Sequence, residues 1–471
     1  MKTTTDLKQV VNLFDNGPQF DSSYSPLYER FSSSTKPSYD YFKGERNVPN
    51  VNCRLLFQKD LKEIQRVDQL NITIYNNKQS LCEQIQNCEM FITNRKYIVD
   101  PLTEEEKLFS IAYSILVYQN PEQFEILLRG IYRPQNFYCI HVDSKASQKL
   151  FDEFECAMKC FPNVFLASKR TQVEWGKMSV LTPELVCMKD LLQFSRWKYF
   201  INLTGQEFPL HTNYELVKIL KILNGSNDAE GTLKRANVER WNITEEPPHN
   251  IHPVKGSIHV TLNRKFVEYV ISSPVAKAFL NWVNKTNVPD ETYFASLIHN
   301  PHLGIPGSFK GDIETDFAVK KPFLSRFKNW VNAPNALPCL GKYVRSICIF
   351  GIGDLPLLAR RPEFFANKFH IGYKPNVVHC MDQLIFNIIL TSKVYKIYEC
   401  EVQTIHADND STTAAQLKND FPSLPKNKIY WEVFLGSGVL SYLNRTRDEY
   451  LQRLKFRATF YEKIESIKNI V

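Results

Sequence analysis

The chain has 471 residues, more than one ordinary domain needs, and 43% of them are hydrophobic, so a sizeable core is possible and global disorder is excluded. The formal net charge of +8 comes from basic residues scattered along the chain, which argues against a nucleic-acid partner. This mild excess fits an anionic ligand and, equally, an ordinary solvated surface.

The N-terminal segment, residues 1–52, is rich in Ser, Pro, Tyr and Asn without periodicity, which is typical of an irregular stem. Its first residues, Met1 to Asp15, lack the apolar core of a signal peptide. The longest apolar run, Ile111 to Tyr118, has the length of a strand rather than of a membrane-spanning helix. No anchor or leader is therefore visible in the sequence. Helical spacing begins at Leu55 and continues to Gln69.

From residue 108 onward, buried strands alternate with helices. The pattern predicts strands at Ser110–Tyr118, Asn136–Asp143, Asn163–Ala167 and Tyr199–Leu203. It predicts helices at Phe124–Gly130, Lys149–Lys159 and Lys177–Leu192, with a kink or restart at Pro183. Such alternation indicates an α/β fold with a mostly parallel sheet, whose ligands bind at the carboxyl ends of the strands. Asp143 lies at one of these ends.

The second half of the chain is less regular. A polar stretch from Asn224 to Lys255 is predicted to be a loop region over a site. The loop Thr204–Pro209 is expected before it, and regular structure after it at Ile258–Asn263 and Phe266–Ile271. Later elements are a helix from Pro289 through Leu297, a connector at Asn332–Pro338 and a strand at Val344–Phe350. Residues 386–471 look like an added segment that ends in a charged helix, Arg447–Ile467.

Eleven cysteines are spread along the chain, and none forms a C-x-x-C pair, which argues against a zinc ribbon or a thioredoxin motif. Their spread favours disulfides in an oxidising compartment, with buried free thiols as the alternative. Sequons such as Asn71-Ile-Thr fit a luminal protein but also arise by chance. The missing leader conflicts with a luminal location.

The sequence lacks a P-loop, a G-x-S-x-G elbow and an H-E-x-x-H motif. Its only Asp-x-Asp, Asp408-Asn-Asp410, follows no predicted strand and is interpreted as a solvated loop. A bound diphosphate would therefore be neutralised by basic side chains, for which Arg345 and Lys368 are candidates. Glu291, which follows Pro-Asp beside two aromatic residues, is a candidate general base, or simply a helix-capping acid.

Six blocks, in chain order, resemble the core 2 β-1,6-N-acetylglucosaminyltransferase family: Arg95–Glu106, Tyr132–Asp143, Cys187–Leu191, Trp197–Pro209, Val344–Leu355 and Phe365–Lys368. The match runs from about Cys53 to Cys380. The resemblance implies a GT-A-type fold and inverting transfer of GlcNAc from UDP-GlcNAc to an O-glycan of a glycoprotein, without a metal or other cofactor. It also implies a Golgi membrane protein, although this chain shows no anchor.

The resemblance assigns roles by position. Glu291 matches the catalytic base, Arg345 and Lys368 the pair that holds the diphosphate, and Asp143 an acid that contacts the nucleotide. The acceptor-binding positions match Glu230, within one residue of alignment, Arg240 and Trp330. Residues 53–385 would form the catalytic domain, with a nucleotide-binding half at 105–215 and an acceptor half with the diphosphate site at 216–385.

The resemblance also implies four disulfides, Cys53–Cys380, Cys88–Cys160, Cys139–Cys187 and Cys339–Cys348. Cys82, Cys156 and Cys400 are additional, and the first two are candidates for a fifth disulfide. An acceptor-contacting Lys of the family is Asn237 here, a site Tyr is Asn332, and an unpaired Cys is Thr204. Because of these departures, the sequence does not determine which glycan is the acceptor.

Two alternatives remain from the sequence. One is a related enzyme with another donor or acceptor, such as a xylosyltransferase-like protein. The other is a catalytically silent carbohydrate-binding protein with the same fold. The presence of Glu291, Arg345 and Lys368 argues against the second, because a lectin needs neither a base nor a diphosphate site.

Overall fold

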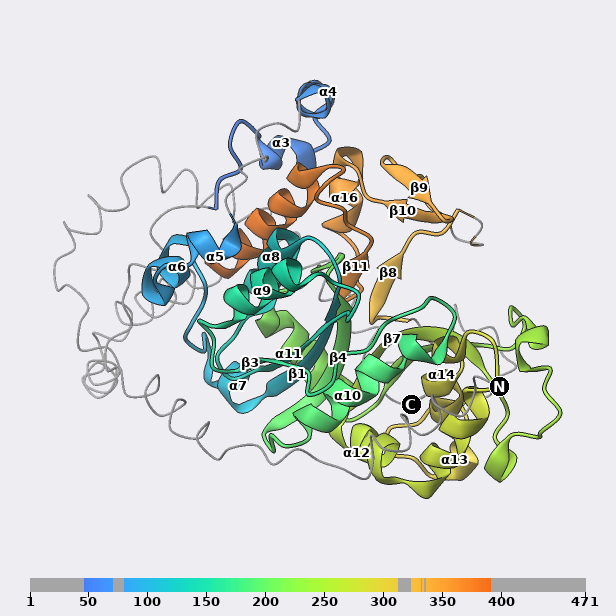
Figure 1. Cartoon of the computed structure of the whole chain (residues 1–471). Coiled ribbons are helices and arrows are strands. Elements are labelled where there is room, and N and C mark those ends of the chain that lie inside the picture. Colours follow the sequence, from blue (N-terminus) through green and yellow to red (C-terminus); the bar gives the residue numbers. More distant parts are fainter. Residues whose placement is uncertain (1–45, 71–79, 312–322, 332, 334–335, 391–471) are drawn as a thin grey trace, which may run out of the picture.

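The computed structural model of the protein describes residues 46–70, 80–311, 323–331, 333 and 336–390. Within these ranges, the molecule is built around one six-stranded sheet with helices on both faces (Figure 1). The expected charged helix at Arg447–Ile467, the Asp-x-Asp at 408–410, Asn332 and Cys400 lie outside the described residues.

The central sheet has the strand order β3-β2-β1-β4-β7-β6. Its strands are β1 (Ser110–Val117), β2 (Phe137–Val142), β3 (Val164–Leu166), β4 (Trp197–Thr204), β6 (Asp228–Thr232) and β7 (Lys255–Asn263). The first four are parallel, β7 is antiparallel to β4, and β6 is antiparallel to β7. This arrangement confirms the expected mostly parallel α/β sheet of a GT-A-type fold.

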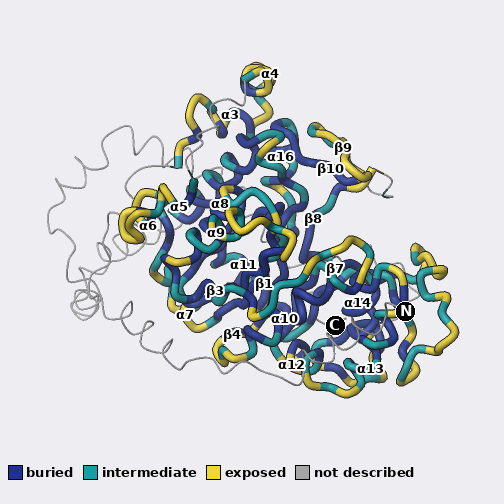
Figure 2. Tube along the Cα trace, in the orientation of Figure 1, coloured by how far each residue is buried: buried dark blue, intermediate teal, exposed yellow. Residues whose placement is uncertain are grey.

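The alternation of side chains along β1 divides the core into two layers. Ile111, Tyr113 and Ile115 pack on one face of the sheet, and Ala112 packs on the other. The first face is covered by α8 (Pro121–Ile131), α9 (Gln148–Met158) and α11 (Asn213–Leu223). The second face is covered by α10 (Thr182–Leu191), α12 (Arg264–Ser272), α13 (Pro274–Val283) and α14 (Tyr293–Ile298). The strands between these layers are almost entirely buried (Figure 2).

A third core lies beside the carboxyl ends of the parallel strands. It contains a small sheet of order β5-β11-β8, formed by β5 (Glu207–Pro209), β11 (Phe365–Asn367) and β8 (Arg326–Lys328). The hairpin of β9 (Lys342–Val344) and β10 (Ile347–Ile349) adjoins it, followed by η9 (Ile352–Asp354) and α16 (Leu355–Leu358). The helices α3 (Cys53–Phe57) and α4 (Leu61–Gln69) and a helix over residues 375–390 complete this core.

The short helices α5 (Leu81–Gln84), α6 (Cys88–Asn94) and α7 (Glu104–Leu108) lead into β1. Among the described residues, every helix is too short or too polar to cross a bilayer. The helix over residues 375–390 runs through the expected domain boundary at residue 386, and its Phe386 and Ile389 are buried.

Five predicted elements differ from the structure. The predicted helix Pro289–Leu297 is a 3₁₀ turn at Pro289–Glu291 followed by α14 from Tyr293. The predicted helix Leu55–Gln69 is divided at Lys59, which has a positive φ of 63°. The predicted loop 204–209 contains β5, and the polar stretch 224–255 contains β6, because main-chain pairing with buried strands overrides poor strand propensity. The predicted strand Val344–Phe350 is a hairpin, since Arg345 and Ser346 both adopt positive φ.

Five disulfides join the described cysteines. The four pairs implied by the family resemblance are present, and so is the suggested fifth pair, Cys82–Cys156. Cys53–Cys380 connects α3 to the helix over residues 375–390 across 327 positions of sequence. The disulfides thus tie the peripheral helices α3, α5 and α6 to the main body of the molecule.

Candidate active site

Glu291 lies in a short turn before α14. The 3₁₀ turn η7 (Pro289–Glu291) follows Val288, and the Glu291 N–H donates to the Val288 carbonyl at 3.1 Å. The carboxylate is 32% exposed, forms an ion pair with Arg240, and lies 3.8 Å from Lys255 Nζ. An accessible carboxylate can approach a substrate hydroxyl, which a general base requires.

Arg240 is fixed to the same loop. It belongs to η5 (Val238–Trp241), where the Asn237 side chain caps the turn by accepting from Glu239 N at 3.2 Å. The Arg240 carbonyl accepts a hydrogen bond from Asn287 N at 3.0 Å, and Trp241 Nε1 donates to Thr292 Oγ1 at 3.0 Å. Bonds on both sides of Glu291 therefore hold the Arg240 guanidinium against the carboxylate.

Glu230 and Lys328 complete this group. Lys328 Nζ lies 3.8 Å from Glu230 Oε2 and donates to Ser257 Oγ at 2.9 Å. Burial lowers the pKa of Lys328, and the charges of Glu230 and Glu291 oppose that effect. Glu230, Arg240, Lys255, Glu291 and Lys328 are called the carboxylate cluster below. It offers alternating donors and acceptors, which suits a polyhydroxylated ligand.

Asp290 lies next to the cluster and is buried. Burial raises its pKa to about 7, and the adjacent charge of Glu291 adds to this rise. Its Oδ1 has no hydrogen-bond partner among the described residues. The two neighbouring carboxyl groups thus differ in environment, with Glu291 exposed and paired and Asp290 enclosed.

Trp330 lies just beyond β8 and is 41% exposed. It forms a β-bridge with Ile347, and the neighbouring Val331 N donates to Ser346 O at 3.0 Å. Trp330 therefore stands between Lys328 of the carboxylate cluster and the turn of the β9–β10 hairpin.

The expected diphosphate residues lie close to one another. Arg345 lies in the hairpin turn rather than in a strand, and Lys368 directly follows β11. The Lys368 carbonyl accepts from Phe350 N at 3.0 Å, which attaches β11 to the hairpin. Burial lowers the pKa of Lys368, and the positive charge of Arg345 lowers it further. Two neighbouring cations favour binding of an anionic group.

The small sheet connects this basic pair with the carboxylate cluster. Asn367 is paired with Glu207 on one side and with Lys328 on the other. Lys368 is thus one residue from the strand position that faces Lys328. The buried carboxylate of Glu207 acts on both lysines, because its charge raises the pKa of Lys368 and Lys328 lowers that of Glu207.

Asp143 lies at the carboxyl end of β2, as expected. It is buried, accepts a hydrogen bond from Lys145 N at 2.9 Å, and lies 3.7 Å from Lys145 Nζ. Its carbonyl accepts from Arg170 at 2.9 Å. Among the described residues, no direct contact joins Asp143 to the other predicted site residues.

Lys255 and Lys328 were not predicted from the sequence. Lys328 lies two positions before Trp330 in Arg326-Phe-Lys-Asn-Trp330, so this spacing was a usable signal. Lys255 begins β7 at the end of a polar stretch and offered no comparable signal.

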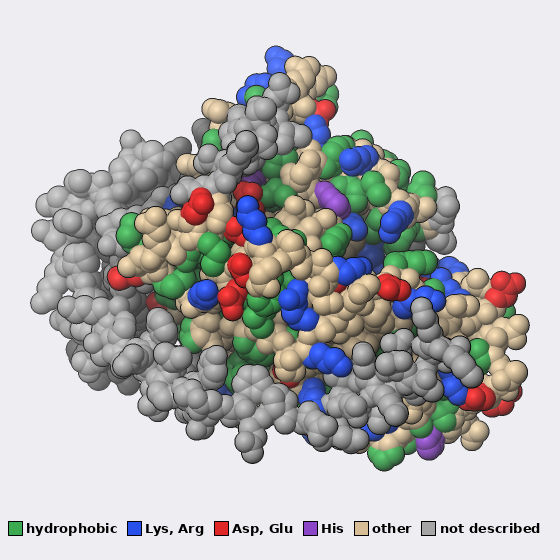
Figure 3. All heavy atoms as spheres, viewed as in Figure 1, with side chains coloured by type: hydrophobic (Ala, Val, Ile, Leu, Met, Phe, Trp, Pro, Cys, Tyr) green, Lys and Arg blue, Asp and Glu red, His purple; other side chains and the backbone are tan. Residues whose placement is uncertain are grey.

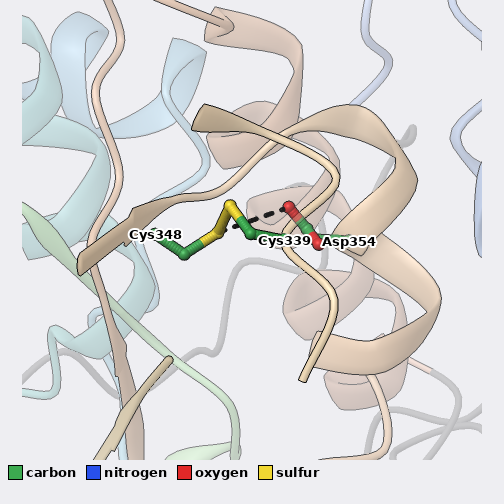
Figure 4. A group of neighbouring side chains, drawn as sticks. All are labelled: Cys339, Cys348 and Asp354. Carbon is green, nitrogen blue, oxygen red and sulfur yellow. Dashed lines mark hydrogen bonds between the residues drawn. A yellow bond between two sulfur atoms is a disulfide. The ribbon is translucent and has the colours of Figure 1, made fainter. Parts of the chain in front are cut away.

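In the described part of the chain, Cys339, Cys348 and Asp354 form a group whose potential metal-ligand atoms lie within 4.8 Å of one another (Figure 4). Both sulfurs belong to a disulfide, so they are not free to bind a metal. Asp354 instead accepts hydrogen bonds from Leu340 N at 2.9 Å and Gly351 N at 2.8 Å. This group supports the base of the hairpin.

The charge distribution also agrees with the sequence analysis. On the face seen in Figure 3, Lys and Arg side chains are interspersed with Asp and Glu.

The comparisons with known proteins point in one direction. The family model described as Core-2/I-Branching enzyme matches residues 111–358. A human protein named beta-1,3-galactosyl-O-glycosyl-glycoprotein beta-1,6-N-acetylglucosaminyltransferase is 36% identical over 373 residues, which is 72% of this chain and 86% of that protein. A rat protein with the same name and the number 3 is 33% identical over 416 residues, 82% of this chain and 92% of its own. A protein of bovine herpesvirus 4 with the first of these names is 33% identical over 367 residues, which is 71% of this chain and 82% of that protein.

Proposed function

Because the chain belongs to the Core-2/I-branching enzyme family, we propose that it transfers GlcNAc from UDP-GlcNAc to a sugar 6-hydroxyl on O-glycans of glycoproteins. The observation that carries this proposal is the position of Glu291, an accessible carboxylate paired with Arg240 beside Glu230 and Lys328. The basic pair Arg345 and Lys368 lies on the same small sheet as Lys328.

In the proposed reaction, Glu291 accepts the proton of the acceptor 6-hydroxyl. The oxygen forms a bond to the anomeric carbon of GlcNAc while the bond between that carbon and the diphosphate oxygen breaks. Attack from the side opposite the leaving group inverts the anomeric configuration. General-base assistance of this kind contributes roughly a hundredfold or more to the rate.

When the bond to the anomeric carbon breaks, its oxygen keeps the electron pair, so UDP leaves with one more negative charge than the diphosphate carried in UDP-GlcNAc, and this charge needs a partner. The Arg345 guanidinium and the Lys368 ammonium supply it in this proposal, so no divalent metal or other cofactor takes part. Asp143 is proposed to contact the nucleotide from the end of β2. Glu230, Arg240 and Trp330 are proposed to bind the acceptor, with the indole ring against the apolar face of a sugar.

The five disulfides support synthesis in an oxidising compartment. We propose that the enzyme works in the secretory pathway, and specifically in the Golgi, where glycoprotein acceptors would reach it.

The test uses protein expressed in a secretory host, UDP-GlcNAc, and a Gal-β-1,3-GalNAc-α-O-aryl acceptor. Glu291→Gln should lower kcat by about a hundredfold or more while UDP binding stays unchanged, because the amide cannot accept the proton. Glu245→Gln removes a carboxylate from a surface ion pair with Lys285 and should match the wild type.

Metal independence and the identity of the donor sugar are tested in separate experiments. Activity should persist in EDTA, and its complete loss there would refute the metal-independent proposal. A donor panel that includes UDP-xylose tests the sugar assignment, since preference for another donor would identify a related transferase. A protein that binds glycans but neither transfers nor hydrolyses UDP-GlcNAc would instead be a carbohydrate-binding protein.

A further inference from the structure

Trp175 is a feature that the proposed site does not yet use. It lies in the segment between β3 and η4 (Met178–Val180) and is 80% exposed, more than any other large apolar side chain among the described residues. An indole ring gains considerably from burial, so one held in water on a structured loop fits a surface that a ligand covers.

One end of this segment is attached beside Asp143. Ser144 N donates to Thr171 O at 3.1 Å, and Arg170 Nη2 donates to Asp143 O at 2.9 Å. Lys145 Nζ donates to the Val173 carbonyl. The segment is thus bonded beside Asp143, the residue proposed to contact the nucleotide.

The other end is attached to the loop that carries the base. Val288 N donates to the Gly176 carbonyl at 3.3 Å, three positions before Glu291. Both residues adopt positive φ, 73° at Gly176 and 53° at Val288, and the latter conformation is costly for a β-branched residue. In Figure 1 the chain that leads into α10 passes beside β7 and α14, in agreement with this contact.

The donor sugar has to lie between these two attachments, because its diphosphate joins it to the nucleotide and its anomeric carbon faces the acceptor oxygen that Glu291 deprotonates. We infer that Trp175 packs against the GlcNAc ring of the donor and helps to select it. This inference rests on the proposed function. It places the two tryptophans that are exposed in the described part of the chain on opposite sides of the reaction, with Trp175 on the donor side and Trp330, near Lys328, on the acceptor side.

The test separates sugar binding from nucleotide binding. Calorimetric titrations use UDP and UDP-GlcNAc in a Glu291→Gln background, which prevents turnover. Trp175→Ala should weaken UDP-GlcNAc binding by about three- to tenfold and leave UDP binding unchanged, as expected for the loss of one aromatic contact. With Glu291 intact, the KM for UDP-GlcNAc should rise by a similar factor while the acceptor KM stays constant. Trp175→Phe should restore most of the affinity.

Controls distinguish this inference from a folding effect and from failure of the proposed function. The unfolding midpoint of Trp175→Ala should equal that of the wild type, since the side chain is exposed. Leu108→Ala removes another exposed apolar side chain, at the end of α7, and should leave both ligands unaffected. An unchanged UDP-GlcNAc affinity, or an effect on the acceptor KM alone, would overturn the inference. Absence of GlcNAc transfer by the wild type would instead overturn the proposed function.

Discussion

Glu184 shows how a single buried carboxyl group affects the stability of this fold. It lies on α10 under the central sheet, where it accepts hydrogen bonds from Ser114 Oγ and from Asn202 Nδ2, the latter at 3.2 Å. Burial raises its pKa to about 8 despite these hydrogen bonds. The group is therefore mostly protonated at neutral pH, and it has no role in the proposed chemistry.

The pH dependence follows from the direction of this change. The folded state holds the proton of Glu184 more tightly than the unfolded state does. The contribution of this group to the free energy of unfolding is therefore fully present below pH 4.5 and is lost as the pH rises towards about 8. Glu184→Gln imitates the protonated form and should not lose this stability. We expect the free energy of unfolding of Glu184→Gln to exceed that of the wild type. This difference should grow as the pH rises and reach on the order of 4 kcal/mol near pH 8.

Denaturant unfolding at several pH values between 5 and 8.5 measures this difference. Glu245→Gln, at the exposed ion pair with Lys285, serves as the control and should parallel the wild type. A constant difference between Glu184→Gln and the wild type over this range would show that Glu184 titrates normally.

At the scale of elements, the β9–β10 hairpin determines where Arg345 lies. Its two turn residues, Arg345 and Ser346, have φ of 49° and 66°, a conformation that Asn and Gly adopt more easily. The base of the hairpin compensates for this strain. The Cys339–Cys348 disulfide closes it, and the Asp354 carboxylate accepts hydrogen bonds from the backbone on both sides, from Leu340 N and Gly351 N (Figure 4). An added Cβ at Gly341 would lie 1.9 Å from the Ile349 carbonyl oxygen, so the two ends are in close contact.

We expect Asp354→Asn to loosen this base, because the amide replaces one acceptor oxygen with a donor that faces an N–H group. UDP binding should weaken roughly tenfold, or about 1.4 kcal/mol, as Arg345 loses its position. The KM for UDP-GlcNAc should rise, and kcat should also fall, because Arg345 is proposed to stabilise the charge that develops on the departing UDP. Ser346→Gly is the matched control, since glycine relieves strain at the tip and should preserve UDP affinity. Equal UDP affinity in Asp354→Asn and the wild type would show that the base does not position Arg345.

The hairpin is also an element that the sequence pattern did not predict correctly. The strands β1, β2 and β4 were identified because strands buried on both faces are continuous apolar runs. The run from Val344 to Phe350 has a similar character, and no Asn or Gly marked its turn, so it was predicted to be one strand. β6, with the sequence Asp-Ala-Glu-Gly-Thr, has Thr232 as its single strand former and is an edge of the sheet only through its pairing with β7.

The same physical reasons limited prediction of the site. Asp143 was expected at a strand end because a parallel sheet places ligands there. The pairing of Arg240 with Glu291 depends on two bonds between distant loops, Arg240 O to Asn287 N and Trp241 to Thr292, which no local pattern encodes. Trp175 was not singled out, because its exposure becomes visible only in the folded chain.

At the scale of the whole molecule, a buried ionic group joins the first and last described segments to α8. Arg46 Nη1 donates to Asp382 Oδ1 at 2.6 Å, and Arg129 Nη2 donates to Asp382 Oδ2 at 2.8 Å. Arg46 also lies over the Phe386 ring at 4.2 Å and donates to the Lys96 carbonyl at 2.7 Å. The nearby Cys53–Cys380 disulfide reinforces the same connection.

Asp382→Asn should destabilise this connection selectively. It leaves two buried guanidinium groups without the carboxylate that pairs with both, and breaking a buried ion pair costs about 3 kcal/mol or more. Because α3 and α4 belong to the third core rather than to the central sheet, we expect them to loosen first. Limited trypsin digestion should then cleave near Arg54 or Lys59 before the sheet unfolds, and UDP affinity should decline in parallel.

Asp68→Asn, which removes an exposed partner of Lys374, should cost less than about 1 kcal/mol and leave the digestion pattern unchanged. Equal protease resistance in the two variants would mean that the buried ionic group does not hold the N-terminal helices.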